Sequence, residues 1–221
     1  KGGTNIKDLH KDNNHIWDLW ATEDGELGPI YGKQWRSFPV REGWRIDQFK
    51  DVMIQLTDKP DTRRAIVTAW NPAVLPDETY SPQENVRMGK QALPPCHWAF
   101  KLRSHAETDG SRTLSMTAYM RSCDVPLGLP FNAPSYATLL IIFAQQLNMN
   151  VGKLHMVLDD VHIYDKDNHI ETAKKQLNAE FFKAPTVTIK KAINIDSYTL
   201  DDFVVNDYVY TKGIKYSAPA V

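Results

Sequence analysis

A cysteine at position 96 is the residue best suited to chemistry, because the stretch "LPPCHWAF" sets it between two prolines and a histidine. A thiolate is a strong nucleophile, and a neighbouring cation lowers the pKa of a thiol. Pro94 and Pro95 fix the backbone before it and remove two hydrogen-bond donors. Most lone cysteines are buried and act as small hydrophobes. The rigid setting makes Cys96 a candidate nucleophile nonetheless.

A second stretch, "YMRSCDVPLGLPFNAPSY" at residues 119–136, carries groups that suit a nucleotide. Arg121 and Ser122 are able to clamp a phosphate. Asn132 offers a donor and an acceptor together, as the amide edge of a pyrimidine requires. Asp124 adds an acid in the same stretch.

Two further stretches complete this pattern. "DDVHIY" places His162 and Tyr164 on one face of a predicted strand, with room for a sugar hydroxyl between them. "DTRRAIV" adds the adjacent cations Arg63 and Arg64. The groups together predict a site for a phosphate, a sugar and a pyrimidine, with a nucleophile.

The elements that must position these residues mix helices and strands without a βαβ rhythm, which predicts an α+β fold. Apolar periodicity and length predict helices within 44–60, 135–149 and 167–179. Strands are predicted at 63–70, 97–104, 113–122, 153–164, 186–192 and 202–210, with a hairpin turn at Asp109-Gly110. The polar, proline-bearing stretch 74–95 is predicted to be a loop able to move.

Bulk composition is that of an ordinary globular chain of 221 residues with a net charge of -1. It has no basic footprint for nucleic acid, and the apolar run "YATLLIIFAQQL" is too short to span a bilayer. No secretory pattern opens the sequence as given. The two cysteines are interpreted as thiols in a reducing compartment, so we expect a cytoplasmic protein.

The whole chain resembles the thymidylate synthase family. The resemblance rests on motifs in the family's order: "IWDLWATEDGELGPIYGKQWR", "DTRRAIVTAWNP", "LPPCH", "RSCDVPLGLPFN", "DVHIY" and "GIKYSAPAV". It implies a mixed β-sheet with helices packed on one face, and a homodimer in which the sheets lie back to back. It implies one catalytic domain over residues 1–221, with deoxyuridine monophosphate (dUMP) and methylenetetrahydrofolate as substrates and no metal.

The resemblance also implies roles, position by position. Cys96 matches the nucleophile that adds to C6 of dUMP, and Tyr31 matches the tyrosine of the water network that removes the C5 proton. Residues matching the dUMP contacts are Arg121, Ser122, Asn132, His162 and Tyr164, with Arg63 and Arg64 donated by the partner subunit. Residues matching the folate contacts are Trp17, Trp20, Asp124, Gly128 and the terminal Val221. Arg121 and Asp124 match catalytic positions as well.

Several of these residues also have simpler interpretations. Trp17 and Trp20, three residues apart, are more often core than cofactor wall on composition alone. Arg63 and Arg64 alone are typical of a solvated surface pair. The hydrogen-bonding role expected for His97 is structural, and Cys123 is expected to be inert. His169 is expected to begin a helix, and Asp159 with Asp160 is not expected to bind metal, since adjacent strand residues face opposite sides.

Three departures from the family pattern bear on the product. Met120 stands where the family usually has a glutamine, and Leu158 and Asp159 stand where it usually has two glycines. The link "DKDNH" is longer than usual. In having Met120 at this position, the chain also resembles the pyrimidine hydroxymethylases of phages. The alternative function is therefore a hydroxymethylase of deoxyuridylate or deoxycytidylate, which would act in the cytoplasm of an infected host. Asn132 and the "PAV" tail favour uracil.

The given chain starts inside the family pattern, at "GGTNI". The family's first several tens of residues normally carry a phosphate-binding arginine and the glutamate of the proton relay. We expect that the sequence is cropped. A molecule that truly began at Lys1 would be expected to bind nucleotide without turning it over, which is a second alternative.

Overall fold

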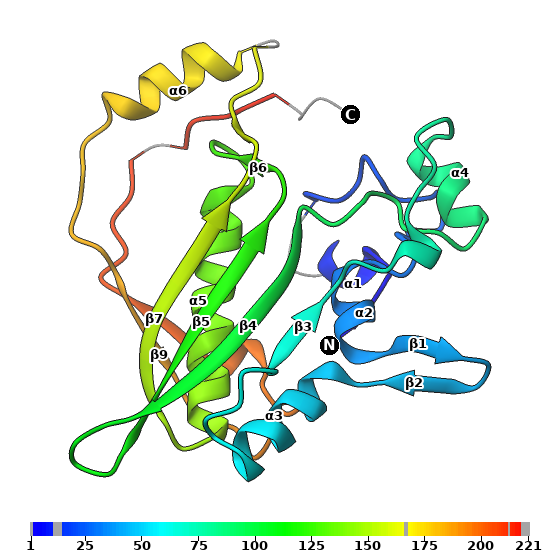
Figure 1. Cartoon of the computed structure of the whole chain (residues 1–221). Helices are drawn as coiled ribbons and strands as arrows, with labels where there is room; N and C mark the ends of the chain where they lie inside the picture. Colours follow the sequence, from blue (N-terminus) through cyan, green and yellow to red (C-terminus); the bar gives the residue numbers. More distant parts are fainter. Residues whose placement is uncertain (1, 11–14, 166–167, 212, 218–221) are drawn as a thin grey trace. The chain divides into compact units, whose positions relative to one another are not determined.

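The computed structural model describes residues 2–10, 15–165, 168–211 and 213–217. It divides into two compact units, Lys1–Ser104 with Thr117–Tyr119 and His105–Met116 with Met120–Val221. The fold is α+β with a mixed sheet, as the sequence predicts, and Figure 1 shows its elements. In the main sheet, strands β3, β4, β5 and β7 are hydrogen bonded in that order.

The first unit is built from short helices around a hairpin and one end of the sheet. Its elements are α1 (Lys7–His10), α2 (Tyr31–Arg36), β1 (Phe38–Arg41), β2 (Trp44–Ile46), α3 (Gln48–Asp58), β3 (Ile66–Thr68), η1 (Pro72–Val74) and α4 (Pro82–Arg87). Strands β4 (His97–Ala106) and β5 (Arg112–Met120) contribute residues to both units. The predicted hairpin of β4 and β5 is confirmed, with Gly110 at a positive φ of 85° in its turn. β3 pairs antiparallel with β4, Val67 opposite Phe100.

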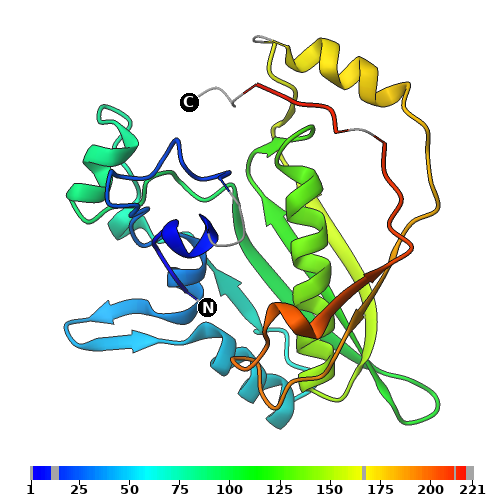
Figure 2. The ribbon, with the colours of Figure 1, turned by 180° about the vertical axis from the view of Figure 1, so that it is seen from behind.

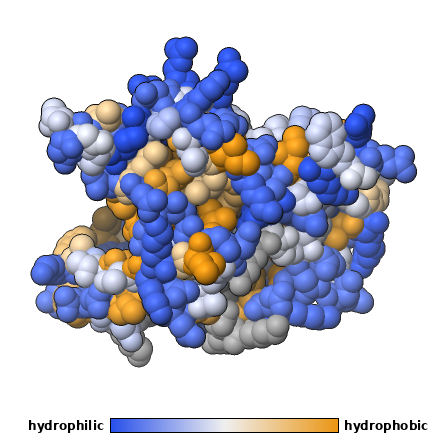
Figure 3. Space-filling view, turned by 90° about the horizontal axis from the view of Figure 1, so that it is seen from below, coloured by the Kyte–Doolittle hydropathy of each residue, from blue (hydrophilic) through white to orange (hydrophobic). Residues whose placement is uncertain are grey.

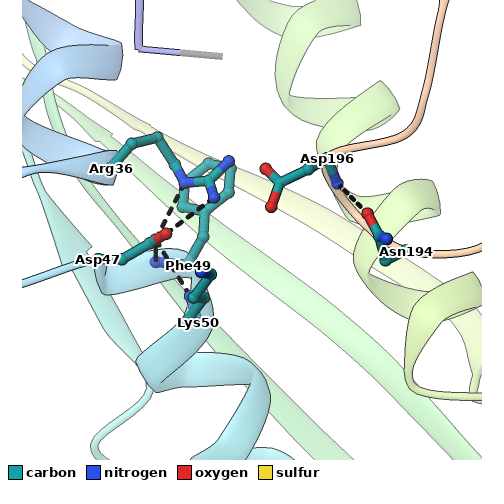
Figure 4. Close-up of polar contacts among 6 residues, drawn as sticks. All are labelled: Arg36, Asp47, Phe49, Lys50, Asn194 and Asp196. Atoms are coloured by element: carbon teal, nitrogen blue, oxygen red, sulfur yellow. Dashed lines mark hydrogen bonds and ion pairs between the residues drawn. The ribbon is translucent and has the colours of Figure 1, made fainter.

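Helix α3 is the predicted amphipathic helix, but it starts later than its apolar pattern suggests. Residues Trp44–Ile46 form β2 instead, and Asp47 caps the helix by accepting from the N–H groups of Phe49 and Lys50. Arg36 donates to both carboxylate oxygens of Asp47, at 2.9 and 2.8 Å (Figure 4). Burial raises the pKa of Asp47, but the hydrogen bonds from Arg36 and from Lys50 outweigh it and hold this pKa below its ordinary value.

The stretch 74–95 was predicted to be a loop, and most of it has no regular secondary structure, but the prediction missed the short helix α4 within it. Ser81 and Glu84 form a reciprocal capping box that starts α4. The buried carboxamide of Asn85 accepts from the N–H of Asp77 and donates to the carbonyls of Asp77 and Tyr80. Local hydrogen bonds of this kind are hard to read from polar residue types, since the same residues also favour open loops.

The second unit packs a long helix against the sheet and closes with a two-stranded ribbon. Its elements are β6 (Cys123–Asp124), α5 (Leu129–Gln146), β7 (Asn150–Leu158), β8 (Val161–His162), α6 (His169–Leu177), β9 (Thr186–Ile189), η2 (Leu200–Asp202) and β10 (Phe203–Asn206). α5 packs on β7, and Figure 2 shows the β9–β10 ribbon crossing α5. Gln145 and Gln146 hold that ribbon region by donating to the carbonyls of Ile189 and Ala192. Beside η2, the Asn194 side chain accepts from the N–H of Asp196 at 2.9 Å (Figure 4).

The strand predicted over 153–164 is wrong in one respect, since it is two strands. β7 ends at Leu158, and β8 spans only Val161–His162. Asp160 between them has a positive φ of 40°, which turns the chain. Tyr164 therefore lies beyond β8 rather than two residues along the same strand.

Seen from below, apolar residues reach the surface between hydrophilic ones (Figure 3). No helix in the described ranges is long and apolar enough to cross a membrane.

Candidate active site

Cys96 lies immediately before β4, on a segment that hydrogen bonds hold in place. It is half-buried, and its backbone N–H donates to the hydroxyl of Tyr31 at 3.1 Å. Upstream, the N–H of Ala92 donates to the carbonyl of Leu27, and the buried Gln91 donates to the carbonyl of Pro29. The backbone before the thiol is thus bonded to the segment that leads into α2.

Tyr31 occupies a backbone conformation that only a well-packed site sustains. It is the first residue of α2, is buried, and has a φ of 25°, where non-glycine residues carry strain of about 1–3 kcal/mol. Gln34, fully buried in the same helix, donates to the carbonyl of Pro29 and accepts from Asn71. These bonds fix the start of α2 and direct the tyrosine hydroxyl to the backbone of Cys96.

His97 stacks on Tyr31, with ring centroids 4.2 Å apart. Burial lowers the pKa of His97 to about 4, because charging a ring away from water is unfavourable. The ring is therefore neutral at ordinary pH and does not supply the cation that a thiolate needs. This geometry favours the structural role predicted for His97.

Trp17 and Trp20 stand at the edge of the same cluster. Their rings meet edge to face at 5.7 Å, and Trp17 lies 5.7 Å from Tyr31. Both are half-buried and pack against buried residues that include Tyr31. Gln83 of α4 donates to the carbonyls of Leu19 and Ala21, which fixes the turn that carries the two tryptophans. Sequence reasoning missed Gln83, since its stretch was predicted to be a loop.

In the second unit, a short parallel bridge brings two predicted groups together. β6 pairs with β8, so that Asp124 lies opposite His162. The N–H of Gly128 donates to the carbonyl of Asp124, and the N–H of Asn132 donates to the carbonyl of Gly128. A Cβ on Gly128 would lie 3.2 Å from the Asp124 carbonyl oxygen. Asp124, Gly128 and Asn132 therefore form one tight turn at the start of α5.

His162 and Tyr164 remain neighbours although the strand ends between them, with rings 5.1 Å apart. Nδ1 of His162 lies 2.7 Å from the carbonyl oxygen of Asp160. A carbonyl only accepts, so Nδ1 carries the hydrogen and Nε2 is the acceptor nitrogen of the neutral ring. The pair thus presents an acceptor and a phenol hydroxyl of the kind that a sugar hydroxyl binds.

Four other predicted residues lie in the described part of the chain. Arg121 and Ser122 are half-buried in the bend between β5 and β6, and Arg63 and Arg64 are exposed before β3. Cys96 belongs to the first unit and Arg121 to the second, so their predicted proximity stays a prediction. Val221 lies outside the described residues.

Acidic and sulfur-bearing side chains form no group able to hold a metal ion within the described ranges. Asp159 and Asp160 follow the end of β7, and Cys123 is fully buried.

Comparison with known proteins supplies the wider context. A family model for thymidylate synthase matches residues 1–220. The chain belongs to the thymidylate synthase family. The thymidylate synthase of Francisella tularensis subsp. holarctica is 46% identical over 215 residues, which is 97% of this chain and 75% of that protein. Those of Francisella philomiragia and Pseudomonas fluorescens are 44% and 43% identical over the same share of both chains.

Proposed function

We propose that this chain is a thymidylate synthase, a methyltransferase that converts dUMP to deoxythymidine monophosphate with methylenetetrahydrofolate as cosubstrate. One observation carries the proposal: Cys96 in the family's "LPPCH" motif, with its backbone bound to Tyr31 in a chain similar to these enzymes along 97% of its length. The cytoplasm is the location that fits this proposal.

Cys96 is the nucleophile in this proposal. Its sulfur forms a bond to C6 of the uracil ring as the C5–C6 double bond opens, which makes C5 nucleophilic. C5 then attacks the one-carbon unit of methylenetetrahydrofolate, and loss of the C5 proton expels tetrahydrofolate and leaves a methylene group on C5. Hydride from that tetrahydrofolate adds to the methylene carbon, the ring double bond returns as the sulfur leaves, and dihydrofolate is released. Methylenetetrahydrofolate supplies both the one-carbon unit and the hydride that completes the methyl group. Tyr31 serves the proton removal and, through its bond to Cys96, fixes where the sulfur starts.

Recognition of dUMP is assigned to groups with matching chemistry. Arg121 and Ser122 hold the phosphate, and the Arg121 cation also favours a thiolate. Asn132 reads the uracil amide edge with its donor and acceptor. His162 and Tyr164 bind the sugar hydroxyl, for which the acceptor Nε2 of His162 is suited.

Folate binding is assigned to aromatic and turn residues. Trp17 and Trp20 give an apolar wall, and Asp124 and Gly128 contact the pterin, with Val221 as the closing terminal carboxylate. A cleft in the second unit, which the neighbouring residues Leu127 and Phe131 help to line, would suit a flat, partly apolar ring system. Its lining includes Leu127, Phe131, Tyr210 and Tyr216.

A homodimer completes the proposal. Arg63 and Arg64 are exposed and are donated to the phosphate site of the partner subunit. Ile66 on β3, and Val151 and Val157 on β7, are about half exposed, which fits a sheet that packs against a second copy.

Product analysis tests the proposal. The full-length protein is incubated with dUMP and methylenetetrahydrofolate, and the products are identified by mass. The expected products are methylated nucleotide and dihydrofolate. Hydroxymethylated nucleotide with tetrahydrofolate would contradict the proposal and favour the reaction suggested by Met120. Nucleotide binding without turnover would favour the inactive binder.

A further inference from the structure

Asn168 at the start of α6 makes three hydrogen bonds to the backbone and side chain of the described part of the C-terminal tail, 213–217. Nδ2 of Asn168 donates to the carbonyl of Lys215 at 3.2 Å. Oδ1 of Asn168 accepts from both the N–H and the hydroxyl of Ser217, each at 2.9 Å. The hydroxyl of Tyr216 donates to Gln176 at 2.7 Å. Figures 1 and 2 both show the red tail running along α6.

His169 adds a buried contact at the same place. It begins α6, as predicted, but it is almost fully buried, and its Nε2 lies 3.1 Å from the carbonyl oxygen of Ser217. Because a carbonyl only accepts, Nε2 carries the hydrogen. Nδ1 has no hydrogen-bond partner among the described residues. The imidazole is therefore oriented by the tail rather than by its own helix.

The His169 ring connects the tail to the predicted sugar site. Its centroid lies 5.5 Å from those of both Tyr164 and Tyr216. Burial and the negative charge of Asp124 raise the pKa of Tyr216, so its hydroxyl stays protonated and able to donate to Gln176. Tyr216 also lines the cleft assigned above to folate.

We propose that Asn168 and His169 are positioning residues that dock residues 215–217 beside Tyr164 and so shape the folate cleft. The inference rests on the proposed function, which gives Tyr164 to the sugar and the cleft to folate. The link "DKDNH", which is longer than the family's usual link, contains Asn168, the residue that makes this contact. Docking acts on folate binding through Tyr216, and on nucleotide binding only through the edge of Tyr164.

Three asparagine variants of the full-length protein test the docking. Asn168→Ala removes all three bonds to the tail, whereas Asn168→Asp keeps an acceptor for Ser217. Asn178→Ala is the matched control, because Asn178 ends the same helix and donates to the carbonyl of Lys174 within it. We expect Asn168→Ala to raise the KM for methylenetetrahydrofolate roughly fivefold, with the Kd for dUMP changed less than about twofold. Asn168→Asp should recover most of that loss.

A second readout needs no turnover. Carboxypeptidase release of residues from the C-terminus, followed by mass spectrometry with saturating dUMP, reports how firmly the tail is docked. Release should be about fivefold faster for Asn168→Ala than for Asn178→Ala. Equal release and equal KM in these two variants would overturn the inference, as would a Kd for dUMP that rises as much as the folate KM. If the wild-type protein does not methylate dUMP, the proposed function fails while the release experiment still decides the docking.

Discussion

The surroundings of Cys96 differ from those of the residues that we assign to nucleotide binding in the second unit. Around Cys96, buried amides such as Gln34 and Gln91 bond to backbone carbonyls. The His97 ring stacks on Tyr31, and the Trp17 ring meets Tyr31 at a tilted angle. Asp124, Asn132 and His162 instead are half-buried and held by backbone bonds in short turns. Cys96 is thus fixed by a packed core, while the groups assigned to the substrate stay accessible.

This difference predicts two kinds of effect from substitutions. Changes around Cys96 should lower stability and turnover together, because the same packing provides both. Changes in the turns of the second unit should alter binding and specificity with little effect on unfolding. Each prediction below is a way to break or sharpen that distinction.

Gly28→Ala should have the largest effect on stability. Gly28 has a φ of 69°, and an added Cβ would lie 2.1 Å from the carbonyl oxygen of Lys90. We expect the free energy of unfolding to fall by at least about 3 kcal/mol. Gly43→Ala is the control, since Gly43 has a φ of 70° and nothing within 4 Å of an added Cβ. It should cost only about 1 kcal/mol in urea unfolding. Similar losses of unfolding free energy in the two variants would show that the backbone around Gly28 shifts at little cost to make room for the added Cβ.

Asn132→Asp should change specificity rather than stability. A carboxylate accepts but does not donate, so it mismatches uracil and suits the amino group of cytosine. We expect kcat/KM for dUMP to fall about 100-fold and the preference to shift towards deoxycytidine monophosphate. The free energy of unfolding should change by less than about 1 kcal/mol, measured in parallel. A large loss of stability would mean that the second region is as tightly packed as the first.

Tyr31→Phe should lower turnover while keeping the ring stack on His97. Loss of the hydroxyl leaves the Cys96 N–H without that acceptor, and we expect kcat to fall about tenfold and stability by about 1 kcal/mol. Tyr198→Phe is the matched control, because the buried Tyr198 hydroxyl bonds Gln145 and Gln146 in the second unit. It should lose similar stability at unchanged kcat. Equal kcat values for the two variants would remove Tyr31 from the reaction.

Gln83→Ala should have the smallest effect, as it acts on the edge of the Cys96 cluster. Without its bonds to the carbonyls of Leu19 and Ala21, the turn carrying Trp17 and Trp20 is less fixed. We expect a threefold rise, approximately, in the KM for methylenetetrahydrofolate. Arg87→Ala changes an exposed residue of the same helix and should leave this KM unaltered. An unchanged KM for Gln83→Ala would show that α4 does not support the tryptophan wall.

The sequence predicts this molecule well where apolar pattern alone decides. The β4–β5 hairpin, α6 and the ribbon strand β9 lie where alternation and helical spacing place them. It fails where polar side chains fold onto nearby backbone, as with Asn85 in α4, or where one residue such as Asp160 takes a positive φ and ends a strand. Such local bonds depend on geometry that residue types do not specify.

The candidate site divides in the same way. Cys96, Asn132 and His162 could be proposed from the sequence because their chemistry and motifs are characteristic, and their roles stay predictions. Gln83 and Asn168 were missed as supports, because a glutamine or asparagine in a polar stretch gives no signal until its backbone partner is known. The grouping of Asp124 with His162 through a two-residue parallel bridge was likewise beyond sequence patterns.

The central claim is that Cys96 attacks C6 of a uracil nucleotide. The most direct measurement is the mass of proteolytic peptides after incubation with 5-fluoro-deoxyuridylate and methylenetetrahydrofolate. We predict that both are trapped covalently on the peptide that contains Cys96, and that Cys96→Ser abolishes trapping together with turnover. An adduct on the Cys123 peptide, or an adduct that survives Cys96→Ser, would contradict the account.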